Sequence, residues 1–304
     1  MFLQAKALGQ SLFSRPYLLL TLTMLFWGGN AVAGQLVVGE VSPLMLTFLR
    51  WLLVCSFLWV TAGRRVIAEW SGVRPRLLWI TGMALCGFTG FNSLFYVASH
   101  DTTAVNIGIL QGSIPVLVFL GAFALHRTRV GLLQVVGAVI TILGVMVVAT
   151  AGDISRLTTL AFNPGDVTMM IACLFYSAYA SALPNRPKVS GLVFFTVMSL
   201  VACVTTLPLA LYEVFSGTVI WPTPKGWAIG LYIALFPSFI AQIFFMRGVE
   251  LIGPGRAGIF VNLVPVFAAG LAVVILSEVF QLYHAVALVL VLGGIWLSER
   301  RKVS

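Results

Sequence analysis

The side chains that could bind a ligand are few and lie inside long apolar runs. Amides and aromatic rings recur within these runs, and Arg50 is the only charged residue placed deep in one of them. Amides donate and accept hydrogen bonds, and rings pack on apolar groups, so this set suits reversible binding of a small amphipathic molecule. The candidate binding residues are Trp27, Asn30, Asn92, Asn106, Gln111, Tyr176, Tyr179, Gln242 and Asn262.

The other polar residues do not indicate catalysis. His100, His126 and His284 are expected at the ends of apolar runs, and no aspartate is expected within one. An intramembrane enzyme needs an aspartate pair, a Ser–His pair or a histidine metal site at depth. The four cysteines lie in apolar runs without metal-ligand spacing. We therefore expect no enzyme, no metal and no cofactor.

The composition indicates where the binding residues must act. Of 304 residues, 60% are hydrophobic and 9% are charged, with a mean hydropathy of +1.04. A soluble domain carries about 25% charged residues. This difference excludes a water-soluble enzyme, a disordered protein and a nucleic-acid binder. The expected partners are the lipid bilayer and a small-molecule substrate, and the residues leave the oligomeric state open, with a monomer compatible.

A bilayer core needs about 20 apolar residues per helix. Measured against that length, the chain is predicted to be an all-α membrane protein with ten transmembrane helices and no soluble domain. Proline, glycine and charged residues mark the breaks between the helices. The predicted spans are residues 17–37, 43–62, 77–98, 102–125, 130–149, 164–183, 190–212, 226–246, 254–276 and 282–298.

The basic residues predict the orientation. If the N-terminus is cytoplasmic, fifteen of the 18 Lys and Arg residues fall on the cytoplasmic side, and only Arg156 and Lys225 fall on the other. Cytoplasmic loops are enriched in Lys and Arg. Both termini are therefore expected in the cytoplasm.

The two halves of the chain resemble each other at a shift of about 150 residues, with Phe95 on Phe245 and Pro115 on Pro265. Five spans per half is an odd number, so the second half must enter the membrane in the opposite orientation. We predict two inverted five-helix repeats, residues 17–149 and 164–298. In such proteins the substrate site lies near the midplane between the repeats.

The candidate binding residues pair under the same shift. The pairs are Asn92 with Gln242, Gln111 with Asn262, Trp27 with Tyr176 and Asn30 with Tyr179. One interpretation is a central cavity lined from six spans. The other is hydrogen bonding between helices, which contributes about 0.6 kcal/mol per contact.

Arg50 and three prolines each allow two roles. Arg50 follows Pro43 by seven residues, about 10 Å along a helix. It either reaches the outer interface, where Glu40 is a possible partner, or meets a substrate carboxylate. Pro115, Pro237 and Pro265 are expected to kink their spans, as gating hinges or as fixed bends.

Several of these residues together resemble the EamA-type family of the drug/metabolite transporter superfamily. The resemblance covers about residues 17–298 in two copies. It rests on Trp27-Gly28-Gly29-Asn30, on Pro43 with Arg50, and on the Pro265 to Glu278 stretch before the last span. The first copy departs from the pattern, since Thr128 stands where the second has Glu278. The resemblance implies ten helices, inverted pseudo-symmetry, export of small metabolites and a bacterial inner membrane.

The sequence thus predicts a secondary transporter that exports small amphipathic metabolites, including aromatic and hydrophobic amino acids, by alternating access. The expected absence of Asp, Glu and His at membrane depth favours an uncoupled carrier or an exchanger. A proton-coupled antiporter is the alternative. Glu278 is expected at the outer boundary as a structural acid near a helix N-terminus.

Overall fold

The computed structural model describes residues 13–126, 131–153, 155 and 162–299, and the regular structure in these ranges is entirely helical. In the same ranges, nine helical segments are long and apolar enough to cross a membrane, and one more, Leu282–Ser298, is apolar but shorter. The longer helices are α2 (Pro16–Leu36), α3 (Pro43–Ala68), α9 (Leu132–Ala149), α11 (Pro164–Ala182), α12 (Gly191–Phe215) and α17 (Leu282–Glu299).

The remaining segments are assembled from shorter pieces. Four of the ten apolar segments are interrupted within their length by a break, a π-helical turn or a 3-10 turn, and a fifth, that of α11, ends in the 3-10 turn η3 (Leu183–Asn185). The pieces are α4 (Trp70–Val73), η1 (Arg74–Arg76), α5 (Leu77–Ala84), η2 (Leu85–Gly90), α6 (Phe91–Ala98), α7 (Ala104–Gln111), α8 (Ile114–His126), α13 (Pro224–Ile233), η4 (Ala234–Ile240), α14 (Ala241–Ile252), α15 (Pro254–Ile259), η5 (Phe260–Leu263) and α16 (Val264–Leu276).

Proline explains where many helices begin. Pro16, Pro43, Pro164, Pro224 and Pro254 each stand in the first turn of a helix. Proline has no backbone N–H, and its φ is already fixed near the helical value, so it fits there without loss. The predicted boundaries fall close to these starts. The main difference is that α3 continues to Ala68 rather than ending at residue 62.

The interruptions of the helices follow the internal repeat. The π-helical turns η2 and η4 lie about 150 residues apart, in the third and eighth apolar segments. The fourth segment breaks between α7 and α8, and the ninth changes to the 3-10 turn η5 between α15 and α16. Irregular turns inside membrane helices are tolerated where other helices or a cavity satisfy the freed backbone groups.

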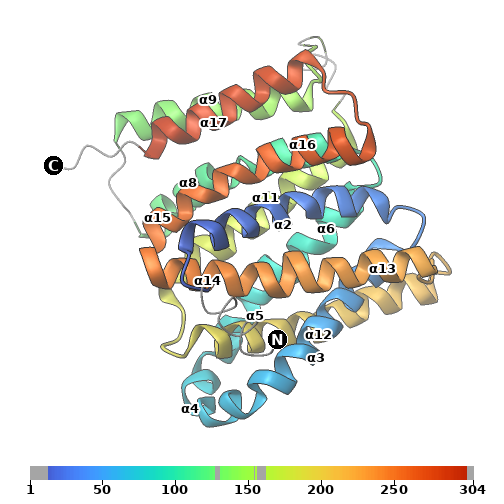
Figure 1. Cartoon of the computed structure of the whole chain (residues 1–304), viewed down its shortest axis with the longest axis vertical. Helices are drawn as coiled ribbons and strands as arrows, with labels where there is room; N and C mark the ends of the chain where they lie inside the picture. Colours follow the sequence, from blue (N-terminus) through green and yellow to red (C-terminus); the bar gives the residue numbers. More distant parts are fainter. Residues whose placement is uncertain (1–12, 127–130, 154, 156–161, 300–304) are drawn as a thin grey trace, which may run out of the picture.

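Equivalent helices of the N-terminal half (α2 to α9) and the C-terminal half (α11 to α17) pack against each other. α3 pairs with α12 and α9 pairs with α17, at opposite edges of the bundle (Figure 1). α2 instead lies against α14 and α16, which are not its equivalents in the other half. The α9–α17 pair needs small residues. A Cβ on Gly137 would lie 2.4 Å from the carbonyl oxygen of Gly294, so a larger residue would force the helices apart.

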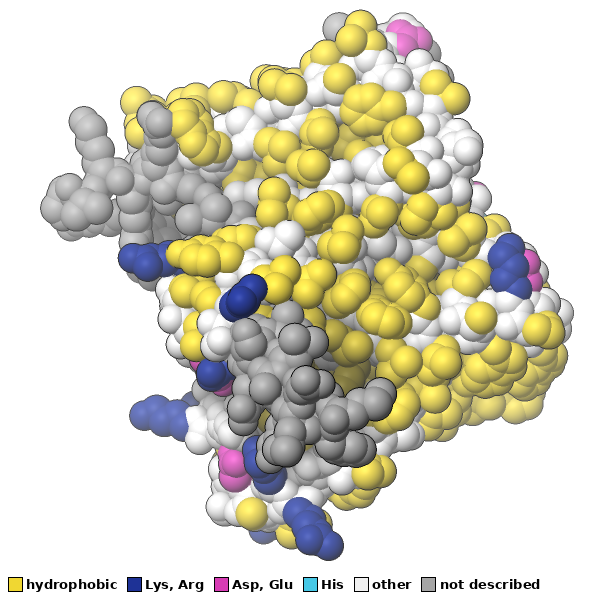
Figure 2. Space-filling view, viewed as in Figure 1, with side chains coloured by type: hydrophobic (Ala, Val, Ile, Leu, Met, Phe, Trp, Pro, Cys, Tyr) yellow, Lys and Arg dark blue, Asp and Glu magenta, His cyan; other side chains and the backbone are white. Residues whose placement is uncertain are grey.

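The bundle has a basic end and an acidic end. The basic end carries Arg15, Arg64, Arg65, Arg74, Arg76, Arg186, Lys188, Arg247 and Arg256. The acidic end carries Glu40, Asp101, Asp166, Glu213 and Glu278. Between the ends, hydrophobic side chains cover the face in Figure 2. Thr128, Arg156 and the first residue of the span expected at 130–149 lie outside the described ranges. So do six of the fifteen basic residues counted on the cytoplasmic side: Lys6, Arg127, Arg129, Arg300, Arg301 and Lys302.

Two hydrophobic cores fill the bundle. The larger lies toward the acidic end and takes buried side chains from all ten apolar segments, including Phe95, Ile107 and Val291. The smaller lies toward the basic end and takes them from five segments, including Val54 and Met198.

Candidate functional site

A cavity lies between the two cores, where the N-terminal and C-terminal halves meet. Its lining includes eight of the nine candidate binding residues, together with Arg50, Pro115 and Pro237. The cavity volume is about 100 Å³, below the ~300 Å³ at which ligand pockets usually start. A metabolite would therefore enter only after the surrounding helices separate. The predicted lining residues are Trp27, Asn30, Asn92, Gln111, Tyr176, Tyr179, Gln242 and Asn262.

The helix interruptions bring these polar side chains to the cavity. Gln111 is the last residue of α7, and Asn262 lies in the equivalent turn η5. Asn92 follows the π-helical turn η2, and Gln242 follows the π-helical turn η4. Four amides at pseudo-symmetric positions thus face one space.

Asn106 was predicted to line the cavity, but it lies outside it. Its amide nitrogen lies 3.2 Å from Asp166 Oδ1, and its Oδ1 lies 3.1 Å from His284 Nε2. Thr102 Oγ1 donates to Asp166 at 2.5 Å. The sequence grouped Asn106 with the cavity amides because it is a polar residue inside an apolar run, but it lies in the first turn of α7, more than one helical turn from Gln111.

Asp166 and His284 also differ from expectation. Both were expected at the periphery, yet their exposed fractions are 2% and 3%. They stand in the first turn of α11 and near the start of α17, and the neighbouring α7 covers both. The sequence places them near a span end but does not reveal that another helix buries them.

The prolines sit at breaks rather than at smooth kinks. Pro115 and Pro265 are each the second residue of a new helix, after the α7–α8 break and after η5. Pro237 lies inside η4, and its carbonyl oxygen accepts a hydrogen bond from the Trp27 indole at 3.0 Å. This bond explains how a tryptophan is accommodated in the middle of α2.

Arg50 reaches the cavity and a buried polar chain. Its guanidinium donates to Tyr96 Oη at 2.7 Å, and Tyr96 Oη donates to Asn30 Oδ1 at 2.9 Å. The pairing with Glu40 does not form, since Glu40 bonds to Lys225 instead. Only 7% of Arg50 is exposed.

An aromatic wall completes the cavity. Trp51 stacks on Phe88 with ring centroids 4.4 Å apart and an interplanar angle of 5°, and Phe88 in turn contacts Tyr179. Gly87 permits this wall, because a Cβ there would lie 2.4 Å from the Tyr179 ring. Tyr176 packs against Tyr179 at 5.5 Å.

Sequence reasoning missed several lining residues. Trp51 could have been identified from the sequence, because a tryptophan away from the membrane interface needs a partner within the bundle. The sequence does not distinguish the other lining rings from ordinary core residues, since phenylalanine is common in apolar spans; these are Phe88, Phe91 and Phe195. Ser238 lies in the π-helical turn and donates to the carbonyl of Ile233 at 2.5 Å.

Carboxylates join the two halves at the acidic end. Glu213 of α12 accepts bonds from the backbone N–H groups of Leu44 and Met45, at 3.0 and 2.8 Å, and from Ser42 Oγ. Glu278 accepts from the N–H groups of Ala104 and Val105, at 2.9 and 3.0 Å. Each acid therefore caps a helix of the other half. Glu278 was expected to complement the N-terminus of the helix that follows it, but its carboxylate caps the N-terminus of α7 instead.

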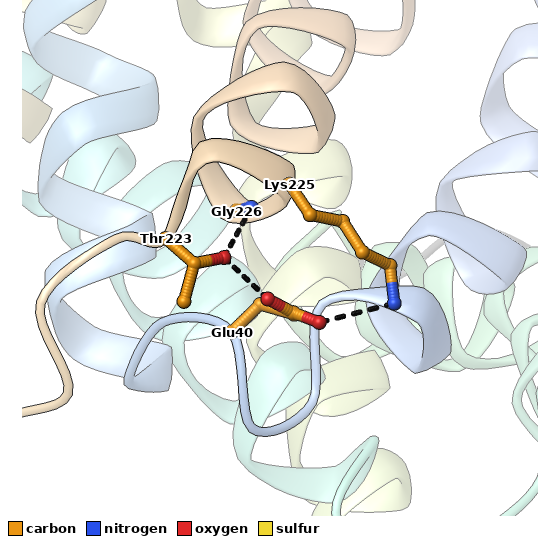
Figure 3. A network of polar contacts seen from close by, with 4 residues as sticks. All are labelled: Glu40, Thr223, Lys225 and Gly226. Carbon is orange, nitrogen blue, oxygen red and sulfur yellow. Dashed lines mark hydrogen bonds and ion pairs between the residues drawn. The ribbon is translucent and has the colours of Figure 1, made fainter.

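The rim of the acidic end is held by Glu40 (Figure 3). Glu40 accepts a hydrogen bond from Thr223 and lies 3.1 Å from Lys225 Nζ. Thr223 in turn caps α13 through the N–H of Gly226 at 3.0 Å. The Thr223 hydrogen bond and the Lys225 charge lower the pKa of the Glu40 carboxyl.

Comparison with known proteins gives a consistent set of similarities. The model of the EamA-like transporter family matches residues 14–150 and again 163–300. The uncharacterized transporter YetK of Bacillus subtilis is 27% identical over 94% of this chain and 87% of its own. A protein of Streptantibioticus cattleyicolor named a probable terminal-alkyne amino-acid exporter is 27% identical over 75% of this chain and 76% of its own. A crystal structure with 20% identity covers 94% of this chain and 97% of its own, with a TM-score of 0.65, and shows the same fold.

Proposed function

The chain belongs to the EamA-like transporter family, and from that premise we propose that it exports small amphipathic metabolites, amino acids above all, by alternating access. The observation that carries the proposal is the cavity between the two halves. It combines amides, aromatic rings and one arginine contributed by both halves. The exporter name of one relative supports the amino-acid class.

The orientation follows from the two ends of the bundle. We place the basic end in the cytoplasm, because cytoplasmic loops carry the excess of Lys and Arg. The ten apolar segments then span the inner membrane of a bacterial cell with both termini inside. The two five-helix halves are inverted repeats that rock against each other around the cavity.

An uncoupled carrier or an exchanger fits the cavity best. Among the described residues, the lining contains no Asp, Glu or His that could bind a proton together with substrate. The arginine is no substitute, because a guanidinium stays protonated at physiological pH. The solute's own gradient then drives transport.

A proton-coupled antiporter is the second candidate, and one observation favours it. Asp166, Asn106 and His284 form a buried hydrogen-bonded chain that joins α11, α7 and α17. If protons drive transport, Asp166 and His284 are the first groups to examine. Glu213 and Glu278 are already committed to helix N-termini.

Proteoliposomes separate these candidates. Counterflow of labelled amino acids, with a quaternary ammonium compound for comparison, tests transport itself. An imposed pH difference without a solute gradient then tests coupling. Counterflow without uphill accumulation supports the uncoupled carrier, whereas uphill accumulation that disappears in Asp166→Asn supports the antiporter. Absence of counterflow for the whole panel contradicts the proposed function.

A further inference from the structure

Three buried polar atoms in the cavity lining lack hydrogen-bond partners among the described residues. They are Arg50 Nε, Trp51 Nε1 and Asn92 Oδ1. Buried polar groups are nearly always paired, and an unpaired one carries a desolvation penalty. Ser93 Oγ shares this property but is not part of the lining. Three such atoms around one cavity point to a ligand that supplies the missing partners.

The three atoms divide by chemistry. Arg50 Nε and Trp51 Nε1 are donors on consecutive residues of α3, and the guanidinium carbon lies 5.3 Å from the Trp51 ring. Asn92 Oδ1 is an acceptor on α6, while the other end of that amide is fixed by donation to the Phe88 carbonyl at 2.6 Å. That bond orients the free oxygen. The lining therefore offers one charged donor, one neutral donor on the next residue, and a separate acceptor.

Arg50 also lacks a counter-ion among the described residues. Asp101 is exposed, and the other acids of the acidic end have partners of their own: Glu40 has Lys225, Glu213 has the start of α3, and Glu278 has the start of α7. Asp166 is bonded to Thr102 and Asn106. A buried charge without a partner is costly, and a charge at membrane depth usually faces a functional partner.

We propose that Arg50 and Trp51 bind the carboxylate of the substrate and that Asn92 accepts a hydrogen bond from its ammonium group. This inference rests on the proposed function and assigns polar subsites within the same cavity. The ligand class is a zwitterion whose two charges sit on one carbon. Its side chain packs on the ring wall of Phe88 and Tyr179. A cationic ligand without a carboxylate leaves Arg50 without a counter-ion and is repelled by the positive charge of the guanidinium.

Four probes with one benzyl side chain test the assignment in counterflow competition. L-Phenylalanine carries both charges, 3-phenylpropanoate carries only the carboxylate, and 2-phenylethylamine and L-phenylalanine amide carry only the ammonium. Hydrogen bonds to charged groups correspond to about 10- to 100-fold in affinity. The wild type should bind L-phenylalanine best and the two amines at least about 10-fold more weakly.

Variants should change the ratios between probes in a defined way. Arg50→Gln should remove the preference for L-phenylalanine over its amide, and Arg50→Lys should retain part of it. Asn92→Leu should weaken L-phenylalanine but spare 3-phenylpropanoate. Trp51→Phe keeps the ring stack and loses only the N–H, so it should reduce carboxylate preference by a smaller factor. Trp70→Phe is its control, because Trp70 is exposed and outside the cavity lining.

Ratios within one preparation do not depend on how much of a variant has folded. If the wild type binds the amide as tightly as L-phenylalanine, or if Arg50→Gln keeps the wild-type ratio, the subsite assignment is overturned while transport stands. If neither these probes nor the wider amino-acid panel shows counterflow, the proposed function itself fails, and the assignment fails with it.

Discussion

The acidic end and the basic end of the bundle are closed in different ways. At the acidic end a hydrophobic core drawn from all ten apolar segments lies beneath four carboxylates that each bond to the other half of the chain: Glu40, Asp166, Glu213 and Glu278. At the basic end the core draws on five segments. Contacts between the halves there include Glu69 accepting from the N–H of Ser190 at 2.8 Å, Arg247 donating to the Phe13 carbonyl at 3.3 Å and, further in, Ser181 Oγ donating to the Val118 carbonyl at 3.1 Å.

This difference predicts which end opens first. Separating the halves at the acidic end exposes a continuous core and breaks charge-assisted bonds to helix N-termini. Separating them at the basic end breaks a smaller core and bonds that are mostly exposed. We therefore expect the halves to separate first at the basic end, while the acidic end stays closed.

The largest effect is expected at Glu213, because it is buried and accepts three bonds from the start of α3. Glu213→Ala should destabilise the protein by about 2–3 kcal/mol. Glu69→Ala is the matched control at the basic end, where one exposed bond is lost, and about 0.5 kcal/mol is expected. Thermal unfolding in detergent measures both. Equal losses would remove the asymmetry between the ends.

The next effect separates the cavity from the acidic-end cluster. Gln111→Leu should lower the transport kcat/KM by about 10-fold or more, since a ligand group is left unpaired, with little change in unfolding temperature. Its amide makes one long bond of 3.4 Å within α7. Asn106→Leu should instead lower the unfolding temperature, because it leaves Asp166 and His284 short of a partner. Normal transport by Gln111→Leu would assign that amide to packing.

A smaller effect is expected at Trp27. Trp27→Phe loses the bond to the Pro237 carbonyl but keeps an aromatic ring in the lining. The relative counterflow rates of aromatic and aliphatic amino acids should change by a few-fold, about 1 kcal/mol. Trp221→Phe, at an exposed position, should leave them unchanged. The same response from both variants would count against a binding role for Trp27.

The smallest effect concerns the rim at Glu40. Its pKa is lowered below the ordinary value of 4.5 by Thr223 and Lys225. A lowered folded-state pKa means that the contact stabilises above 4.5 and is lost as the pH falls through the folded value. The difference in unfolding temperature between wild type and Glu40→Gln should thus stay constant from about pH 8 to about pH 6 and shrink only in more acidic solution. A difference that disappears near neutral pH would contradict this.

Much of the helical architecture could be predicted from the sequence, because bilayer thickness sets helix length and proline marks helix starts. The repeat also pairs Asn92 with Gln242 and Gln111 with Asn262, and the structure places these four side chains in the lining of one cavity. Equivalent positions in the two repeats lie at the same depth in the membrane. Because a polar side chain is costly in contact with lipid, these amides face the interior of the bundle.

The remaining contacts depend on how the halves pack. Glu213 and Glu278 cap helices far away in the chain, and Asn106 bonds to two residues that hydropathy places at span ends. Phe88 faces the cavity only because Gly87 leaves room for the Tyr179 ring. None of these contacts has a local sequence pattern.

The most direct test asks whether the substrate site is the cavity between the halves and whether that cavity opens toward the basic end. The variants Gln111→Cys and Asn106→Cys each carry a single cysteine once the four native ones are replaced, namely Cys55, Cys86, Cys173 and Cys203. Each variant can then be labelled with an impermeant maleimide from either side of oriented proteoliposomes. We expect the cysteine at position 111 to be labelled from the basic side and to be protected by the amino acid with the fastest counterflow. The cysteine at position 106 should show no such protection. Labelling of position 111 from the acidic side alone, or without protection by any transported amino acid, would contradict the account.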